Sequence, residues 1–220
     1  MSRPLARRRV LLGSAAGVLG VGALAACSDA PPAGPGPAPS AAPPPSSTTP
    51  TRVPYVGDQR GIALCAATSA LAASLYSGAV VAAGDGRLGQ VPAVVTAFLS
   101  GAGAQHTEHA AAWNQLLTAA GVPAVTGAPL TVENDRRAAL GRAAAPTDLL
   151  SLAVDVEAMT GGTIAARAGE FTDPGAAALA ATLAPVTAMH GATAAFLLGR
   201  PTGSAPGSAG APLGLDALTA

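Results

Sequence analysis

The sequence is short of aromatic residues, cysteine and charge, and it contains no lysine. Aromatic residues make up 3% of the 220 residues and charged residues 11%, whereas half of the chain is hydrophobic. Alanine dominates that half, and alanine has the highest helix propensity of all residues. This composition favours helices that pack closely through small side chains over a β-sheet. We therefore expect an all-α fold.

The charges and missing motifs exclude several function classes. All twelve basic residues are arginine, the formal net charge is zero, and no basic run occurs beyond the first ten residues. Nucleic-acid-binding domains carry a basic patch or stripe, so we expect no nucleic-acid partner. The sequence also has no glycine-rich phosphate loop between a strand and a helix, no nucleophile elbow and no zinc-finger spacing of cysteine and histidine.

The N-terminus has the layout of an export signal. Residues 2–9 are positively charged, and residues 10–26 are apolar and uncharged. This apolar stretch is long for a secretory signal but short for a comfortable membrane span. The order Leu-Ala-Ala ahead of Cys27 resembles the bacterial lipobox, where a lipid is attached to the cysteine. We expect residues 1–27 to be a lipoprotein signal peptide, with Cys27 anchoring the mature chain to the outer face of the cell membrane. An uncleaved membrane anchor is the alternative, and it also places the domain outside the cell.

The pair Arg8 and Arg9, followed by Val-Leu-Leu, resembles a twin-arginine signal. That export route carries folded proteins, often with a cofactor already bound. Arginine-rich segments also occur in general secretory signals, so both routes stay open.

The chain has two cysteines, Cys27 and Cys65. If Cys27 carries a lipid, Cys65 has no partner left for an intrachain disulfide. Cys65 lies in an apolar run, which predicts a small buried hydrophobic residue instead of a reactive thiol.

The mature chain divides by composition into a linker, a helical domain and a tail. Residues 28–54 are almost entirely Pro, Ala, Ser, Thr and Gly, which predicts a disordered, extended stalk. Residues 55–200 form the expected domain and residues 201–220 a flexible tail. Within the domain, we expect four helices and a loop over 125–145. The expected helices cover residues 61–83, 92–120, 147–168 and 174–199.

Two of these helices, 61–83 and 174–199, carry no charge and are long enough to cross a bilayer. Their residues are mostly Ala, Gly, Ser and Thr, which are weakly apolar beside the Leu, Ile, Phe and Val of membrane spans. His190 would also lie deep in lipid. The sequence therefore favours buried helices of a four-helix bundle.

Polar residues fall on the apolar stripes of three helices, where spacings of three and four residues mark the inward face. On 92–120, the stripe is Val95, Leu99, Ala102, His106, His109, Trp113 and Leu116. On 147–168, it is Leu150, Ala153, Glu157, Thr160 and Ile164. On 174–199, it is Leu179, Leu183, Val186, His190, Thr193 and Leu197. All three histidines and one glutamate are therefore expected to point inward.

An ionised Glu157 in an Ala/Leu core is costly unless a cation or donor accompanies it. One metal ion bound by His106, His109, Glu157 and His190 would satisfy all four side chains. In the alternative, Glu157 hydrogen-bonds one or two histidines and no metal binds. The spacing alone does not separate these interpretations.

The same residues resemble bacterial exported ferritin-like domain proteins. The resemblance runs from about Gly61 to Pro201 and is most specific from His106 onward. It is carried by His-Thr-Glu-His-Ala-Ala-Ala-Trp-Asn at 106–114, Ala-Gly-Val-Pro-Ala-Val-Thr-Gly at 120–127, Leu-Ala-Val-Asp-Val-Glu at 152–157, Pro-Val at 185–186 with His190, and Leu-Leu-Gly-Arg-Pro at 197–201. It implies a ferritin-like four-helix bundle in a lipoprotein.

Ferritin-like proteins that bind two irons use a carboxylate from each of two helices and a Glu-x-x-His pair from each of the others. Here the resemblance puts His106 in the place of a glutamate, and Thr187 in the place of another. The first helix has no carboxylate near the expected place, Ser69 or Leu71. One carboxylate cannot neutralise two ferric ions in a dry core. A single divalent ion (Fe, Mn, Zn or Cu) remains compatible with the residues.

Three functions stay open on this basis. The first is a membrane-anchored lipoprotein that binds one divalent metal ion. The second is a metal-free helical module that serves a structural role or binds a protein partner at the cell surface. The third, a two-metal oxidase, is disfavoured by the missing carboxylates, and we expect no enzyme activity of that kind.

Overall fold

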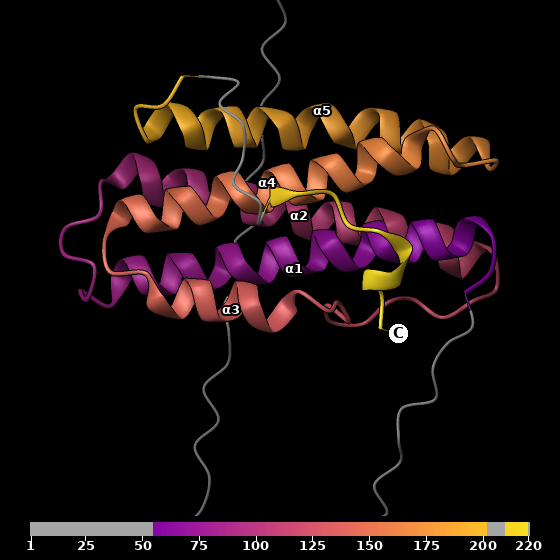
Figure 1. Ribbon diagram of the computed structural model, residues 1–220, viewed down its shortest axis with the longest axis horizontal. Coiled ribbons are helices and arrows are strands. Elements are labelled where there is room, and N and C mark those ends of the chain that lie inside the picture. Colours follow the sequence, from indigo (N-terminus) through magenta and orange to yellow (C-terminus); the bar gives the residue numbers. More distant parts are fainter. Residues whose placement is uncertain (1–54, 202–209, 220) are drawn as a thin grey trace, which may run out of the picture. The chain divides into compact units, whose positions relative to one another are not determined.

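The computed structural model describes residues 55–201 and 210–219, which belong to one compact unit, Thr48–Ala220. The described chain is helical (Figure 1) and contains no strand beyond one isolated bridge, which confirms the all-α class. Its elements are α1 (Asp58–Gly84), α2 (Ala93–Ala119), α3 (Glu133–Arg142), α4 (Pro146–Ala168), α5 (Pro174–Leu197) and the short 3-10 helix η2 (Leu215–Ala217). The expected signal peptide with Arg8, Arg9 and Cys27, and the linker 28–54, lie outside the described residues.

The four long helices, α1, α2, α4 and α5, lie where the sequence predicted them, within a few residues at each end. The start of α5 shows why. The Asp173 carboxylate accepts a hydrogen bond of 2.7 Å from the Ala176 amide, and Pro174 occupies the first helical position. Such a cap satisfies an amide that the helix itself leaves unpaired. At the end of α2, Gly121 adopts φ +72° and stops the helix.

The four long helices pack side by side, α1 chiefly along α2 and α4 chiefly along α5. Gly61 near the start of α1 contacts Phe171 just beyond the end of α4, and Gly175 near the start of α5 contacts Leu116 near the end of α2. Helices α1 and α4 are therefore antiparallel, and so are α2 and α5. Since α1 is also antiparallel to α2, helices α2 and α4 run in the same direction (Figure 1). The 120–145 connection must return along helices of about 40 Å.

Helix α3 lies inside this connection and corrects our expectation of a loop over 125–145. None of its ten residues is buried, so the sequence shows no apolar stripe that would predict this helix. The Arg137 guanidinium lies 2.9 Å from the Glu133 carboxylate one turn earlier, which supports a helix locally. Leu140 on α3 contacts Gly78 on α1 and fixes α3 against the four long helices.

Residues 210–219 also differ from the flexible tail that we expected over 201–220. Leu218 is buried and forms an antiparallel bridge with Leu130 of the connection. The Thr219 amide donates to the Pro129 carbonyl at 2.8 Å, and the Leu213 amide donates to the Thr163 hydroxyl at 2.9 Å. The glycines and prolines around these leucines are typical of a flexible tail, so the sequence did not reveal that this apolar segment packs on the domain.

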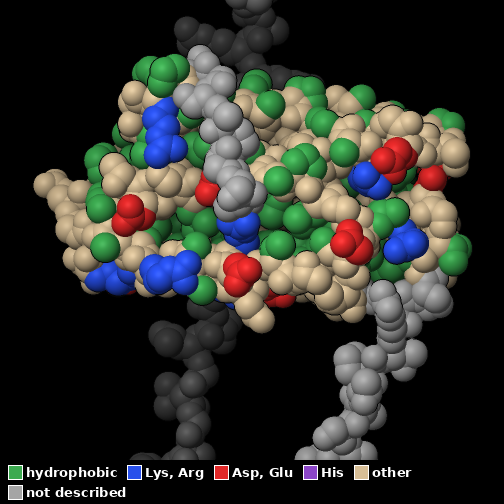
Figure 2. Space-filling view, viewed as in Figure 1, with side chains coloured by type: hydrophobic (Ala, Val, Ile, Leu, Met, Phe, Trp, Pro, Cys, Tyr) green, Lys and Arg blue, Asp and Glu red, His purple; other side chains and the backbone are tan. Residues whose placement is uncertain are grey.

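Three described helices, α1, α4 and α5, are long and apolar enough to cross a membrane as judged by length and composition. They differ in how much they bury. Most of α1 lies in the core, whereas α5 is the most exposed of the three and leaves Met189 and Phe196 at the surface. On the face seen in Figure 2, acidic and basic side chains are interspersed among apolar ones without a large patch of one sign.

Candidate metal centre

The four long helices each bring a buried polar side chain to one level of the core. Tyr76 comes from α1, His106 and His109 from α2, Glu157 from α4 and His190 from α5. His106 and Glu157 are 0% and 1% exposed, and the other three are also buried. The predicted inward stripes of the helices that carry His106 and Glu157 are confirmed, except that Leu117 replaces Leu116 among the fully buried residues.

On α5 the predicted stripe is partly wrong. Leu183 and His190 are buried as expected, but Thr193 is exposed and Thr187 is buried instead. The true stripe is Ala176, Ala180, Leu183, Thr187, His190 and Ala194. In an alanine-rich helix, both faces are apolar, so the sequence carries little information about its rotation.

Glu157 lies at the centre of the cluster. Its Oε1 accepts a hydrogen bond of 2.5 Å from the Tyr76 hydroxyl, and it lies 2.9 Å from Nε2 of His106 and 3.4 Å from Nδ1 of His190. Ligand atoms of His106, Glu157 and His190 all lie within 4.8 Å of one another. Bonds of about 2.1 Å in a tetrahedral metal site place ligand atoms about 3.4 Å apart. The separation of 3.4 Å between His190 and Glu157 matches this value, and small movements of the other ligand atoms would let all three side chains bind one ion.

Several buried atoms of the cluster lack a hydrogen-bond partner. They are Nδ1 of His106, Nδ1 of His109, Oε2 of Glu157 and Nδ1 of His190. A buried polar atom without a partner costs about 1–3 kcal/mol, and more when it is charged. The unpaired carboxylate oxygen of Glu157 is the costliest of these. Two imidazoles and a carboxylate are ligands that suit Zn, Fe(II), Mn or Cu, so the residues present fit a divalent ion.

Gln105 on α2 orients the His190 ring. Nε2 of His190 lies 3.1 Å from Oε1 of Gln105, so the ring donates its Nε2–H to the amide oxygen. In this orientation, the lone pair of Nδ1 faces Oε1 of Glu157. Two acceptors at 3.4 Å repel one another unless a proton or a cation lies between them. Hydrogen bonding of the second ring nitrogen is also how proteins orient metal-binding histidines.

The surroundings set the charge of the cluster. Burial alone would raise the pKa of Glu157, but its close contacts with His106, His190 and Tyr76 outweigh burial, and the net shift is downward. Burial and the adjacent carboxylate raise the pKa of Tyr76 well above 10. Burial, together with His106 and His190, lowers the pKa of His109 to about 4. At neutral pH the cluster thus contains a carboxylate, a phenol and a neutral His109.

The structure brings together three of the four predicted ligands. His109 packs its ring edge-on against His106, with centroids 5.4 Å apart, but it is not among the residues whose ligand atoms converge. Its imidazole lies next to the three-residue group formed by His106, Glu157 and His190, which we call the metal centre. His109 is therefore a neighbour of the metal centre in this conformation.

Tyr76 is the residue that sequence reasoning missed. The ferritin-like pattern places a carboxylate near Ser69 or Leu71, yet the Ser69 hydroxyl donates to the Cys65 carbonyl within α1. The Tyr76 ring stacks on His106 at a centroid distance of 5.7 Å and an angle of 14°. Tyr76 is the largest polar side chain on the buried face of α1, and that was the available signal.

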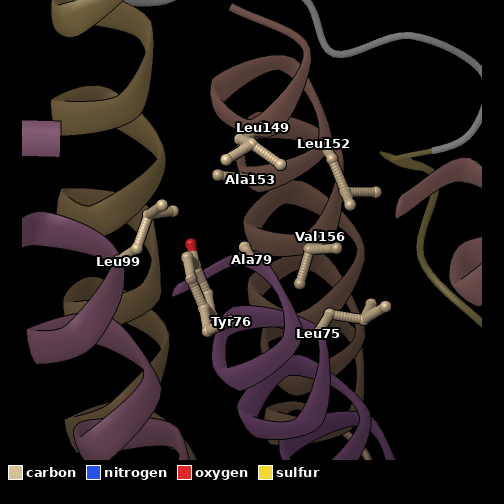
Figure 3. Close-up of a pocket in the computed structure, with 8 residues that line it drawn as sticks. All are labelled: Leu75, Tyr76, Ala79, Leu99, Leu149, Leu152, Ala153 and Val156. Carbon is tan, nitrogen blue, oxygen red and sulfur yellow. The ribbon is translucent and has the colours of Figure 1, made fainter. Parts of the chain in front are cut away.

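A small cavity beside Tyr76 does not extend the site. Figure 3 shows its lining, which is apolar apart from the tyrosine, and its volume is about 10 Å³. The space corresponds to about one water, and an apolar cavity of this kind stays dry. The lining residues are Leu75, Tyr76, Ala79, Leu99, Leu149, Leu152, Ala153 and Val156.

No second carboxylate enters the core of the described chain, where Glu157 is the one buried acidic residue. Thr187, which stands in the place of a glutamate in the resemblance, donates its hydroxyl to the Ala184 carbonyl at 2.8 Å and contacts Gly161 on α4. Cys65 is buried as predicted, and burial raises the pKa of its thiol to about 12. A thiol in this state is a poor metal ligand and a poor nucleophile.

In comparisons with known proteins, no family model, no curated protein and no solved structure matches the chain. The resemblance to exported ferritin-like domain proteins therefore rests on the sequence motifs alone.

Proposed function

We propose that this chain is an exported lipoprotein, anchored at Cys27, whose domain is a ferritin-like four-helix bundle that binds one divalent metal ion. His106 and His190 would provide imidazole nitrogens, and Glu157 would provide a carboxylate oxygen. The observation that carries the proposal is the buried, unpartnered Oε2 of Glu157 beside two imidazoles that converge within 4.8 Å. A cation removes the cost of that isolated charge.

The arrangement of the helices supports the ferritin-like part of the proposal. Ferritin-like bundles have one long crossover connection among four helices and hold their ions in the bundle core. Here the 120–145 connection joins two helices that run in the same direction, and the metal centre draws on three of the four long helices. The motifs that led to the resemblance lie on these helices.

The charge of the metal centre supports one ion. Glu157 contributes a single negative charge, so one divalent ion leaves a net charge of +1 among neutral imidazoles. Two ferric ions would leave +5 in a core without another carboxylate, which is prohibitive in a low-dielectric interior. A bound ion would supply Lewis acidity, and in the case of iron, manganese or copper one-electron redox chemistry. The protein would exclude water from the ion and fix its ligands.

The metal-free module remains the second candidate, and one observation favours it. Tyr76 and His106 already hydrogen-bond Oε1 of Glu157, so half of the carboxylate is satisfied by the chain itself. A network of this kind can position helices without an ion. The domain would then present a surface to a protein partner.

Metal analysis of the purified full chain separates the two candidates. We expect one equivalent of metal after loading, lost on chelation and greatly reduced in the His190→Ala and Glu157→Gln variants. Glu108→Gln is the matched control, because Glu108 lies on the exposed face of α2 and should leave binding unchanged. A chain that takes up no metal and whose melting temperature ignores added ions would support the metal-free module. Oxygen consumption driven by iron(II), with two irons bound, would contradict the single-ion proposal.

A further inference from the structure

Packed side chains cover the metal centre on three of its four sides. Toward α1 and α2, Tyr76 stacks on His106 and packs edge-on against Phe98, with centroids 6.1 Å apart. Toward α4 and α5, Gly191 leaves so little room that a Cβ there would lie 3.3 Å from Cβ of Glu157. Toward α1 and α4, the wall consists of the apolar residues around the small cavity. A groove of about 300 Å³ between α1 and α2 reaches the Tyr76 ring, and this ring covers His106 on that side.

The fourth side, between α2 and α5, is different. Helices α2 and α5 pack less extensively on each other than α2 packs on α1 and α5 packs on α4. The residues here are polar: Gln105 is exposed, His190 is 8% exposed and His109 is 7% exposed, whereas His106 behind them is 0% exposed. A hydrogen bond of 3.1 Å between Gln105 and His190 closes the gap between the helices. Exposure thus increases from the metal centre outward along this side, through polar side chains.

His109 lies on this side of the metal centre with an unused ligand atom. Its Nδ1 is buried and has no hydrogen-bond partner, which costs free energy unless something else uses it. Its ring contacts His106, which belongs to the metal centre, at a centroid distance of 5.4 Å. His109 is therefore outside the ligand set and adjacent to it, on the side that leads to solvent.

We propose that a divalent ion enters and leaves the metal centre between α2 and α5, and that His109 binds it transiently on the way. This inference rests on the proposed function. The imidazole replaces part of the hydration shell that the ion gives up before it reaches His106, and so lowers the barrier to passage. Because His109 holds the ion only in transit, it changes the rates of uptake and release without changing the affinity.

The kinetics of Co²⁺ binding to the full chain test this role. Uptake is followed by the visible absorption of Co²⁺, and release by transfer to an excess of chelator. In His109→Leu, an apolar side chain takes the place of the imidazole between α2 and α5, and we expect both rates to fall by about tenfold or more. The dissociation constant and the Co²⁺ spectrum should stay at wild-type values. Gln115→Leu, which adds the same side chain on the exposed face of α2, should leave both rates unchanged.

Three outcomes overturn the inference. A weaker affinity together with an altered Co²⁺ spectrum in His109→Leu would make His109 a ligand of the bound ion. Unchanged rates would place the route elsewhere. A wild-type chain that binds no Co²⁺ at all would refute the proposed function itself, which keeps the two failures distinguishable. If His109→Leu does not fold, His109→Gln, which keeps a polar side chain, should slow both rates by a smaller factor at constant affinity, and unchanged rates there would be equally decisive.

Discussion

Replacing Tyr76 with phenylalanine should destabilise the metal-free protein through a single lost hydrogen bond. The substitution keeps the ring, its stacking on His106 and its packing near Phe98, and it removes only the hydroxyl that donates to Glu157 at 2.5 Å. Both partners are almost fully buried, at 3% and 1% exposed, so solvent cannot replace the lost donor. A buried hydrogen bond to a charged group contributes about 1.5–3 kcal/mol. We expect the free energy of unfolding to fall by about 2 kcal/mol.

The chain offers a matched control in its other tyrosine. The Tyr55 hydroxyl donates to the Pro123 carbonyl at 3.1 Å in a partly buried position, and both of these groups are neutral. Tyr55→Phe should therefore cost only about 0.5–1.5 kcal/mol. Urea unfolding in the presence of a chelator measures both variants, and the m-value should stay constant because the surface exposed on unfolding is the same.

The pH dependence of the free energy of unfolding provides an independent test of the role of Glu157. Because folding lowers the pKa of Glu157, its charged form stabilises the folded state above the unfolded pKa, and this contribution is lost as the pH falls through the folded pKa. The gap between wild type and Tyr76→Phe should thus narrow below about pH 4. If Tyr76→Phe costs no more than Tyr55→Phe at pH 7, the charged hydrogen bond does not contribute as argued. A gap that widens in acid would refute the reasoning as well.

Two further predictions concern His109 and the contact between α4 and α5. In the metal-free protein, the His109 ring should stay neutral down to about pH 4, so its NMR ring-proton shifts should remain constant between pH 8 and pH 5. Folding lowers the pKa of His109 from 6.5, so neutral His109 should stabilise the fold fully above pH 6.5 and progressively less as the pH falls toward 4. A titration midpoint near pH 6.5 in the NMR shifts would contradict the burial of its ring. Gly161→Ala should cost about 1–3 kcal/mol, because the added methyl group meets Thr187 with no room to move. Gly101→Ala, on the open face of α2, should be neutral or stabilise by about 0.5–1 kcal/mol in the same thermal unfolding assay, and equal effects at the two positions would show that packing is not the cause.

The inward-facing histidines of α2 and Glu157 of α4 were predictable because their stripes contrast with polar neighbours. On α2, His106 and His109 lie between leucine, alanine and tryptophan at regular spacings, and the structure buries both. On α5, His190 was predicted correctly, but the register of its neighbours was not, because Thr193 and Thr187 are alike in polarity and lie among alanines. Rotation of such a helix is decided by packing against α4, which the sequence does not display.

The remaining errors have two physical causes. Helix α3 has polar residues on every side, so periodicity could not reveal it, and its helical state depends on a local ion pair and on Leu140 packing against α1. The second cause is that a sequence pattern does not show which side chains meet in space. His109 shares a helix face with His106, yet its ligand atoms fall outside the metal centre, whereas Tyr76 reaches Glu157 from a helix that offers no carboxylate. Reach and direction of individual side chains are tertiary properties.

The bridge between Leu218 and Leu130 attaches residues 210–219 to the connection between α2 and α4. Ala217 and Leu218 cover apolar surface of the 120–145 connection, and two backbone hydrogen bonds link the segments at Thr131 and Thr219. The connection therefore attains its final packing only after synthesis has passed Leu218. Removing residues 213–219 would loosen a segment almost ninety positions earlier, whereas His106, Glu157 and His190 lie on other helices and would keep their positions.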